Sequence, residues 1–164
     1  MIYLRKAKEE DIAIITRLAE EIWPQTYSEY ISEDQLRYML DLMYNKGELL
    51  GQLRKGHIFL IATEGSKDVG FAGFSLVNPE EYVYKLHKLY VLPEMHGKGV
   101  GKLLINEVAD IAKKNHGKAL QLNVNRNNKA KDFYERAGFH IKETVDLDIG
   151  NGFYMNDYVM EKAL

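Results

Sequence analysis

The chain lacks cysteine altogether, and this absence excludes several kinds of chemistry at once. Without thiols it can form no disulfide, no zinc finger and no acyl-cysteine intermediate. The formal net charge is −2, whereas proteins that bind a nucleic-acid backbone normally carry a clear basic excess. No apolar run approaches the roughly 18 residues needed to cross a membrane, and the N-terminus has no apolar signal core. We therefore expect no nucleic acid, membrane or metal as a partner, and a cytoplasmic location by default.

The pattern of apolar residues predicts an order of elements that mixes hairpins with crossovers. With 46% hydrophobic residues, the chain is expected to form one core in a single domain over residues 1–164. Helical spacing predicts a helix over about 9–23, ended by Pro24, and a second helix that begins after Ser32 and Gln35, a capping-box pair, and ends at Gly47 or Gly51. Further helices are expected over about 100–114 and 128–137, and strands over about 2–5, 57–62, 69–76, 83–91, 119–124, 139–145 and 153–162. This order predicts an α+β fold with a mixed, mostly antiparallel sheet flanked by helices.

A glycine-rich turn joins an apolar strand to an amphipathic helix in the middle of the chain. Gly97, Gly99 and Gly101 leave main-chain N–H groups unobstructed by Cβ atoms, while Lys98 and Lys102 add positive charge near a helix N-terminus. The spacing differs from a P-loop and from a dinucleotide fingerprint, because no Gly-Lys-Ser/Thr and no third glycine at the required position follow. A glycine-enriched connection without a ligand is the alternative. The turn predicts an anion site that would fit a pyrophosphate.

Two separated motifs resemble those of one enzyme family. Residues 96–101, His-Gly-Lys-Gly-Val-Gly, are similar to a Gln/Arg-x-x-Gly-x-Gly/Ala loop, with His96 where the family usually has Gln or Arg. An Asn-x-x-Ala-x-x-x-Tyr-x-x-x-Gly-Phe pattern is present as Asn127, Ala130, Tyr134, Gly138 and Phe139. With both motifs in this order, the chain resembles the GCN5-related N-acetyltransferase (GNAT) superfamily. Its C-terminal segment and second helix are similar to bacterial spermidine/polyamine acetyltransferases. The resemblance implies splayed central strands and transfer of an acetyl group from acetyl-CoA to an amine.

The resemblance implies separate roles for the residues that would bind acetyl-CoA. The glycine loop would bind the pyrophosphate through main-chain N–H groups, and the splayed strand would pair with the pantetheine arm as if the arm were a strand. The N–H near Val91 would stabilise the developing oxyanion. Asn127 would hydrogen-bond the arm, although a residue just before a helix is equally compatible with capping. The expected cofactor-binding residues are Leu89, Tyr90, Val91, Gly97, Lys98, Gly99, Val100, Gly101, Lys102 and Asn127.

The resemblance also indicates candidates for catalysis and for the acceptor side. It places the Tyr134 hydroxyl beside the leaving sulfur as a general acid, with a packed aromatic as the alternative. His87, on the strand that leads to the thioester, is the candidate base, because imidazole titrates near neutrality; a water ordered by Glu81 or Glu94 is the alternative. Aromatic faces that attract an amine are expected on the acceptor side, with core packing as the alternative. These acceptor-side residues are Trp23, Tyr27 and Tyr30.

The resulting hypothesis is direct transfer from acetyl-CoA to a primary amine of a small molecule in a ternary complex, with a polyamine among the acceptors. Two alternatives stay open. Acetylation of a protein N-terminus or lysine predicts an open groove in place of a closed pocket. A non-catalytic sensor or partner module would bind coenzyme A without turnover. A homodimer is also left open.

Overall fold

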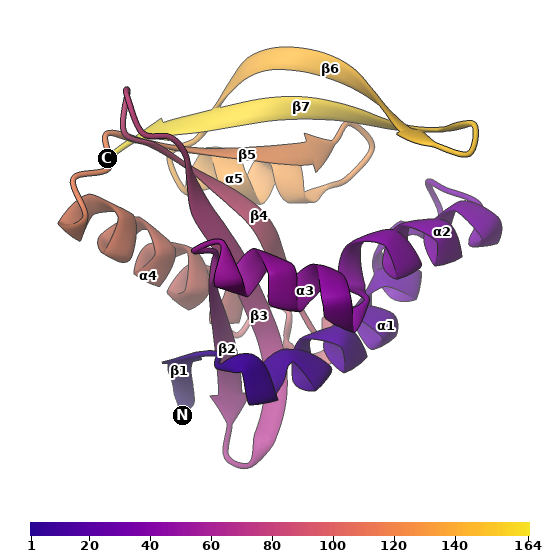
Figure 1. Cartoon of the computed structure of the whole chain (residues 1–164), viewed down its shortest axis with the longest axis horizontal. Coiled ribbons are helices and arrows are strands. Elements are labelled where there is room, and N and C mark those ends of the chain that lie inside the picture. Colours follow the sequence, from indigo (N-terminus) through magenta and orange to yellow (C-terminus); the bar gives the residue numbers. More distant parts are fainter.

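The structure is a computed structural model that describes residues 1–164 as one seven-stranded sheet with five α-helices packed against it (Figure 1). The strands are β1 (Ile2–Lys6), β2 (Ile58–Glu64), β3 (Lys67–Asn78), β4 (Val83–Val91), β5 (Ala119–Asn125), β6 (His140–Gly150) and β7 (Phe153–Ala163). The helices are α1 (Ile12–Tyr27), α2 (Glu33–Tyr44), α3 (Lys46–Arg54), α4 (Val100–Lys114) and α5 (Ala130–Arg136), with short 3-10 helices η1 (Glu9–Asp11) and η2 (Pro93–Met95). The predicted mixed α+β fold is confirmed.

The strands follow the order β1-β2-β3-β4-β5-β7-β6 across the sheet. Every neighbouring pair is antiparallel except β4 and β5, which are parallel and joined by the α4 crossover. That parallel pairing runs only from Val83 opposite Ala119 to Leu86 opposite Leu122. Beyond these residues β4 and β5 diverge, as the resemblance implied, so the sheet opens in its centre.

Both faces of the sheet are covered, as the burial of β3 demonstrates. Seven consecutive residues of this strand, from Val69 to Ser75, are buried. Because successive side chains of a strand point to opposite faces, an unbroken buried run requires cover on both. Helices α1 and α4 both pack against β3 and β4, and α2 and α3 lie beside α1 (Figure 1). A single cluster of 33 buried hydrophobic residues forms the core.

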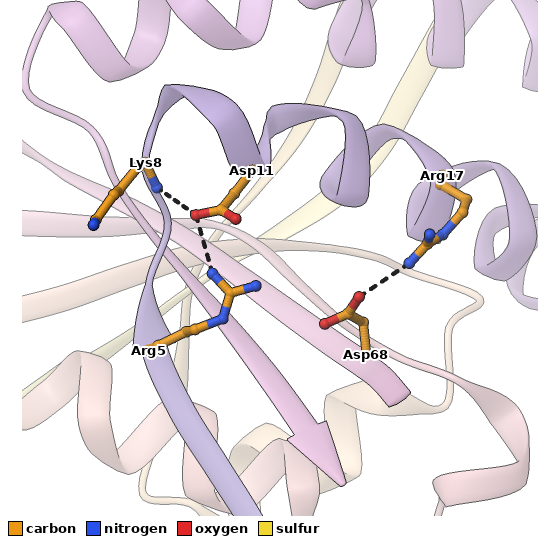
Figure 2. A network of polar contacts seen from close by, with 5 residues as sticks. All are labelled: Arg5, Lys8, Asp11, Arg17 and Asp68. Carbon is orange, nitrogen blue, oxygen red and sulfur yellow. Dashed lines mark hydrogen bonds and ion pairs between the residues drawn. The ribbon is translucent and has the colours of Figure 1, made fainter. Parts of the chain in front are cut away.

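Polar contacts join the start of α1 to the neighbouring strands (Figure 2). The Asp11 carboxylate accepts from the Lys8 main-chain N–H at 2.8 Å and pairs with Arg5 of β1 at 3.0 Å. Farther along α1, Arg17 pairs with Asp68 at the start of β3 at 3.1 Å. Exposed ion pairs of this kind contribute at most about 1 kcal/mol each. They join the start of α1 to β1 and β3, and α1 carries Trp23 and Tyr27 farther along.

Two expected helix boundaries are wrong. Pro24 does not end the first helix, which continues to Tyr27 and whose C-terminal Ser28 N–H donates to Pro24 O at 3.2 Å. The proline removes one N–H donor, but Ile22 and Trp23 before it are buried, and this packing outweighs the local cost. The second helix ends at Tyr44 because Asn45 has an extended backbone, and the Asn45 side chain accepts from Glu48 N–H to begin α3. Both Gly47 and Gly51 therefore lie inside α3.

The expected cap of α2 is half confirmed. Ser32 Oγ accepts from the Gln35 N–H at 3.1 Å, as a capping box requires. The Gln35 side chain does not return to Ser32. Its Nε2 donates to Tyr154 O at 3.1 Å, and Tyr38 Oη donates to Ile149 O at 2.7 Å. Both contacts fasten α2 to the tip of the β6–β7 hairpin, which reaches toward α2 in Figure 1.

Candidate active site

A cavity of about 660 Å³ lies where β4 and β5 diverge. This volume is in the range of small-molecule and cofactor sites. Its walls come from α1, β4, the glycine loop, β5 and α5. The predicted site residues that line it are Tyr27, His87, Leu89, Tyr90, Val91, Gly97, Gly99, Val100, Gly101, Lys102 and Tyr134. Residues from four distant parts of the sequence thus meet in one space.

The end of β4 presents to this cavity main-chain groups that pair with no neighbouring strand. Leu92 N–H donates to Val69 O of β3, so the adjacent Val91 belongs to a pair that makes no hydrogen bonds to β3. By the same alternation, the N–H and C=O groups of Leu89 also point away from β3. Because pairing with β5 stops at Leu86, these groups face the open edge. The edge can therefore accept an extended, amide-containing ligand as an additional strand.

The glycine loop between η2 and α4 presents a second set of free donors. The main-chain N–H groups of Gly97, Gly99, Val100, Gly101 and Lys102 make no hydrogen bond within the protein. Gly97 and Gly99 have φ of +80° and +82°, which a residue with a side chain rarely adopts. A Cβ at either position would point into open space, so nothing in the chain fills the loop. Converging N–H groups at a helix N-terminus suit a diphosphate, and the loop therefore fits this part of coenzyme A.

His96 connects the loop to β4. Its Nε2 donates to Val91 O at 3.2 Å, so the imidazole holds the loop against the open edge. The His96 side chain thus positions the loop and leaves anion binding to the main-chain donors.

Cationic side chains around the loop differ in part from those expected. Lys102 lines the cavity, but Lys98 does not. Lys129 and Arg136 line it as well and were missed by sequence analysis. Together with Phe133 they follow helical spacing, i, i+4 and i+7, and so share one face of α5. Once the helix is assigned, this spacing predicts that Lys129 and Arg136 lie on the same face as Phe133.

Tyr134 lies on α5 with its ring buried and its hydroxyl in the cavity. The ring packs edge-on against Phe133 and Phe139, at 5.4 and 5.8 Å between centroids. The hydroxyl makes no hydrogen bond within the protein, although the residue is only 8% exposed. Burial, with a smaller contribution from the nearby Tyr27, raises the pKa of this phenol well above its usual value of 10. The hydroxyl is therefore held as a proton donor and is available to a ligand.

His87 is placed at the cavity but in surroundings that oppose its protonation. Its Nε2 shares a hydrogen bond of 2.7 Å with Ser75 Oγ, and its ring stacks on His57 at 4.8 Å. Burial, followed by the positive potentials of His57, Lys88 and Lys85, lowers the pKa of His87 to about 3. The imidazole is thus neutral at physiological pH and only weakly basic. Its predicted role as the base has support from its position and not from its basicity.

The low pKa of His87 has a measurable effect on stability. In the unfolded chain this histidine takes up a proton near pH 6.5, whereas in the folded chain it does so only near pH 3. Stability is therefore unaffected above pH 6.5 and falls as the pH drops from 6.5 toward 3, by at most about 1.4 kcal/mol per pH unit. We expect His87→Gln to reduce this slope in urea unfolding measured at a series of pH values. The exposed His140→Gln serves as the matched control, and an unchanged slope in His87→Gln would contradict the assignment.

A second cavity, of about 380 Å³, lies on the side of α1 and α2. It shares Tyr27, His87, Tyr90 and Asn123 with the first cavity, so the two spaces meet along β4. At this junction the Tyr27 and Tyr90 hydroxyls are 2.8 Å apart. The cavity is bounded by α2 and by residues of the β6–β7 hairpin that α2 contacts. The cavity is therefore partly enclosed, between the helices on one side and the hairpin on the other.

Of the three aromatic residues expected on the acceptor side, two line a cavity and one does not. Trp23 lines the second cavity and packs on Tyr27 and Tyr90, with centroids 4.9 and 5.6 Å apart. Tyr27 lines both cavities, whereas Tyr30 lines neither. Asn127 is exposed and lines neither cavity; the neighbouring Asn128 lines the first and caps α5 by accepting from Ala130 N–H at 2.9 Å.

Charged residues of the second cavity were not found from the sequence. Lys88 is only 7% exposed; its Nζ donates to Gln52 Oε1 at 2.9 Å and lies 5.6 Å from the ring centres of Tyr44 and Phe59. Burial lowers the pKa of Lys88 to about 8. The remaining charged residues that line this cavity are Lys85, Glu48 and Asp157. The cavity therefore carries equal numbers of basic and acidic side chains.

No group of three or more histidine, aspartate or glutamate side chains lies close enough together to hold a metal ion. None of the helices combines the length and apolar character that crossing a membrane requires.

Known proteins share this fold over the whole chain. The model of the acetyltransferase (GNAT) family matches residues 14–139. The sequence is 29% identical to spermidine N(1)-acetyltransferase of Thermoplasma acidophilum, over 98% of this chain and 96% of that protein. The crystal structure of PaiA N-acetyltransferase from Thermoplasma acidophilum in complex with coenzyme A matches with a TM-score of 0.84 and 28% identity, over 100% of this chain and 99% of that one. A GCN5-related N-acetyltransferase structure from Rhodopseudomonas palustris matches with a TM-score of 0.82 and 25% identity, over 99% and 95% of the two chains.

The fold, the open edge of β4 and the glycine loop define a transferase that works with coenzyme A. The chain belongs to the acetyltransferase (GNAT) family. It is an acyl-CoA-dependent N-acetyltransferase with acetyl-CoA as its co-substrate. The expectations of fold, family, enzyme class and co-substrate are confirmed.

Proposed function

We propose that this enzyme acetylates a primary amine of a small molecule, and that the amine binds in the second cavity while acetyl-CoA occupies the first. The observation that carries the proposal is the junction of the two cavities along β4, at Tyr27 and Tyr90. Two ligands held on either side of this junction can react directly, because their reacting atoms are brought together in one orientation. No covalent acyl-enzyme is needed, and the chain has no cysteine to form one.

The residues of the first cavity have distinct tasks in this proposal. Main-chain N–H groups of the glycine loop hold the diphosphate, and the Leu89 and Val91 main chains pair with the pantetheine arm. The Val91 N–H faces the thioester carbonyl and stabilises the negative charge that develops on its oxygen. Acetyl-CoA supplies the activated acyl group when bound. Tyr134 donates its proton to the departing sulfur, a role that suits its unpaired hydroxyl.

The size of the second cavity supports a small acceptor. A volume of about 380 Å³ bounded by α2 and the β6–β7 hairpin accommodates a small amine. The charge of this cavity supports a polyamine less than its size does, because Lys85 and Lys88 share the cavity with two carboxylates. The spermidine acetyltransferase of Thermoplasma acidophilum, at 29% identity, makes spermidine the first acceptor to test.

Release of coenzyme A in the presence of acetyl-CoA and a panel of acceptors tests the proposal. The panel contains spermidine, monoamines, amino-acid amides, and peptides with a free N-terminus or a lysine. We expect saturable turnover with at least one small primary amine, and initial-rate lines that intersect, as a ternary complex requires. Turnover with peptides alone would favour a protein acetyltransferase. Binding of coenzyme A without turnover on any acceptor would favour a sensor.

A further inference from the structure

The most unusual charged group in the protein is Asp157, at the middle of β7. The residue is only 1% exposed, and its Oδ1 has no hydrogen-bond partner. Its Oδ2 accepts a single long hydrogen bond, at 3.4 Å, from Asn123 Nδ2. A buried carboxylate is normally paired or fully hydrogen-bonded, because burial without a partner costs several kcal/mol, of the order of 2–7 for a polar group. Asp157 therefore needs a hydrogen-bond or ion-pair partner, and the protein itself does not supply one.

The strand order explains how this carboxylate reaches the second cavity. Strand β7 lies between β5 and β6, and Asp157 is opposite Asn125 in the β5–β7 ladder. Opposed residues of a ladder share a face, and residues two positions apart on one strand share it too. Asn123, Asn125 and Asp157 accordingly form a polar row on one face, and all three line the second cavity.

The charged groups around Asp157 do not satisfy it. Lys85 of β4 and Arg126 after β5 are near enough to affect its titration, but neither forms an ion pair with it. Arg126 instead pairs with Asp146 of β6 and donates to Val145 O. On the α1 side, the negative potential of Asp157 contributes to raising the pKa of Tyr27 to about 12, after the larger effect of burial. Asp157 and Tyr27 both line the second cavity, and Tyr27 lines the first as well.

We infer that Asp157 binds the ammonium group of the acceptor amine and takes a proton from it, which makes it a catalytic residue of the acceptor side. The inference rests on the proposed function and identifies the group that this function still requires. An ammonium donates several hydrogen bonds to carboxylate oxygens, and the aromatic rings of Trp23 and Tyr27 attract the same cation. Asp157 is the buried, unpaired carboxylate of this cavity; Glu48 is exposed at its rim and accepts from Gln52 Nε2 at 3.0 Å.

The proton and electron balance is simple. The ammonium transfers one proton to the Asp157 carboxylate, and the nitrogen lone pair forms the C–N bond to the acetyl carbon while the C–S bond breaks. The sulfur takes its proton from Tyr134, and the second proton lost by the amine restores the Tyr134 hydroxyl. Asp157 then releases its proton to water, so each turnover yields one amide, one thiol and one proton. Burial is the largest influence on Asp157 and raises the pKa of its carboxyl, which makes it a better proton acceptor than an exposed aspartate.

Asp157→Asn keeps the shape of the side chain and removes its charge. With an amine that the wild-type enzyme acetylates, we expect kcat/KM for the amine to fall by about 10²-fold or more. The dissociation constant of coenzyme A should change by less than about twofold, because Asp157 itself does not line the first cavity. Asp110→Asn on α4 is the matched control; its carboxylate is exposed and lines neither cavity, and kcat/KM should stay within about twofold of wild type.

The pH profile separates this role from a structural one. In the wild-type enzyme, kcat/KM for the amine should be level between the pKa of Asp157 and that of the free ammonium, because the protonated amine is the form that binds. In Asp157→Asn only neutral amine reacts, so kcat/KM should rise tenfold per pH unit up to the pKa of the amine. The hydroxyl analogue of the amine should inhibit both enzymes equally.

Three outcomes overturn the inference. One is a wild-type profile that itself rises tenfold per pH unit, which needs no variant to observe. The second is an Asp157→Asn enzyme that is folded and as active as wild type, which leaves the proposed function standing. The third is coenzyme A binding with no turnover on any amine, which removes the proposed function together with the inference.

Discussion

Tyr134→Phe is expected to lower kcat by about 10²- to 10⁴-fold while the apparent KM for acetyl-CoA changes little. The substitution removes one oxygen atom, and that oxygen makes no hydrogen bond within the protein. The phenyl ring keeps its packing against Phe133 and Phe139, so the fold and the cavity should be preserved. A departing thiolate must then take its proton from water, and the loss should fall on the chemical step. Steady-state kinetics with an acceptor identified by the amine panel provides the measurement.

Tyr3→Phe gives the matched control, because this tyrosine lies on β1 with 60% of its surface exposed and lines neither cavity. It should behave as wild type. If Tyr134→Phe instead raised the KM for acetyl-CoA without lowering kcat, the hydroxyl would be a binding group and not an acid. The two variants together distinguish loss of a tyrosine in general from loss of this hydroxyl.

Sequence patterns predicted best those features that depend on neighbouring residues. The strand Val83–Val91, the glycine turn after it and the helix from Val100 are all local, and each was found at or near its bounds. A break such as Asn45 was missed because the apolar pattern continues across it. The break is imposed by one side chain that caps the next helix. Pro24 misled for the opposite reason, since the packing of Trp23 and Ile22 overrides the local preference.

The candidate site likewise has one part that depends on neighbouring residues and one part that depends on the tertiary arrangement. Its donor side is built from main-chain groups of one continuous stretch, from Leu89 to Lys102, and a motif in that stretch is enough to indicate it. Its acceptor side depends on which strands become neighbours. Asp157 is one polar residue in an ordinary strand pattern, and only the insertion of β7 beside β5 brings it next to Asn123. No spacing along the chain encodes that contact.

The divergence of β4 and β5 accounts for both sides at once. Ending the parallel ladder at Leu86 frees the β4 edge for one ligand, and the two cavities meet along β4. Tyr27 and Tyr90 line both cavities at this junction and are joined by their hydroxyls. A donor bound along β4 would thus direct its thioester toward the second cavity. This arrangement explains why one structural irregularity is associated with two cavities.

Gly101→Asp tests the other end of the first cavity, where the diphosphate is proposed to bind. Gly101 lies in the first turn of α4, and a carboxylate there is favourable for the helix itself, so the variant should fold. Its negative charge would occupy the space among the free N–H groups and repel a diphosphate. We expect the affinity for coenzyme A, measured by calorimetry, to fall by about 10²-fold or more, since like charges placed together cost several kcal/mol.

Gly101→Asn has nearly the same shape without the charge and separates repulsion from bulk. The Cβ of either variant would lie 3.4 Å from Cζ of Phe133, a tight contact that a half-buried ring can relieve by a small shift. The asparagine variant should therefore lose much less affinity, and added salt should narrow the gap between the two, because screening weakens repulsion but not steric contact. Equal losses of affinity in both variants would mean that the added side chain weakens coenzyme A binding by its volume alone and not by its charge. Unchanged affinity in Gly101→Asp would show that the diphosphate binds elsewhere, and the roles given to the β4 edge and to Tyr134 would then need a different ligand.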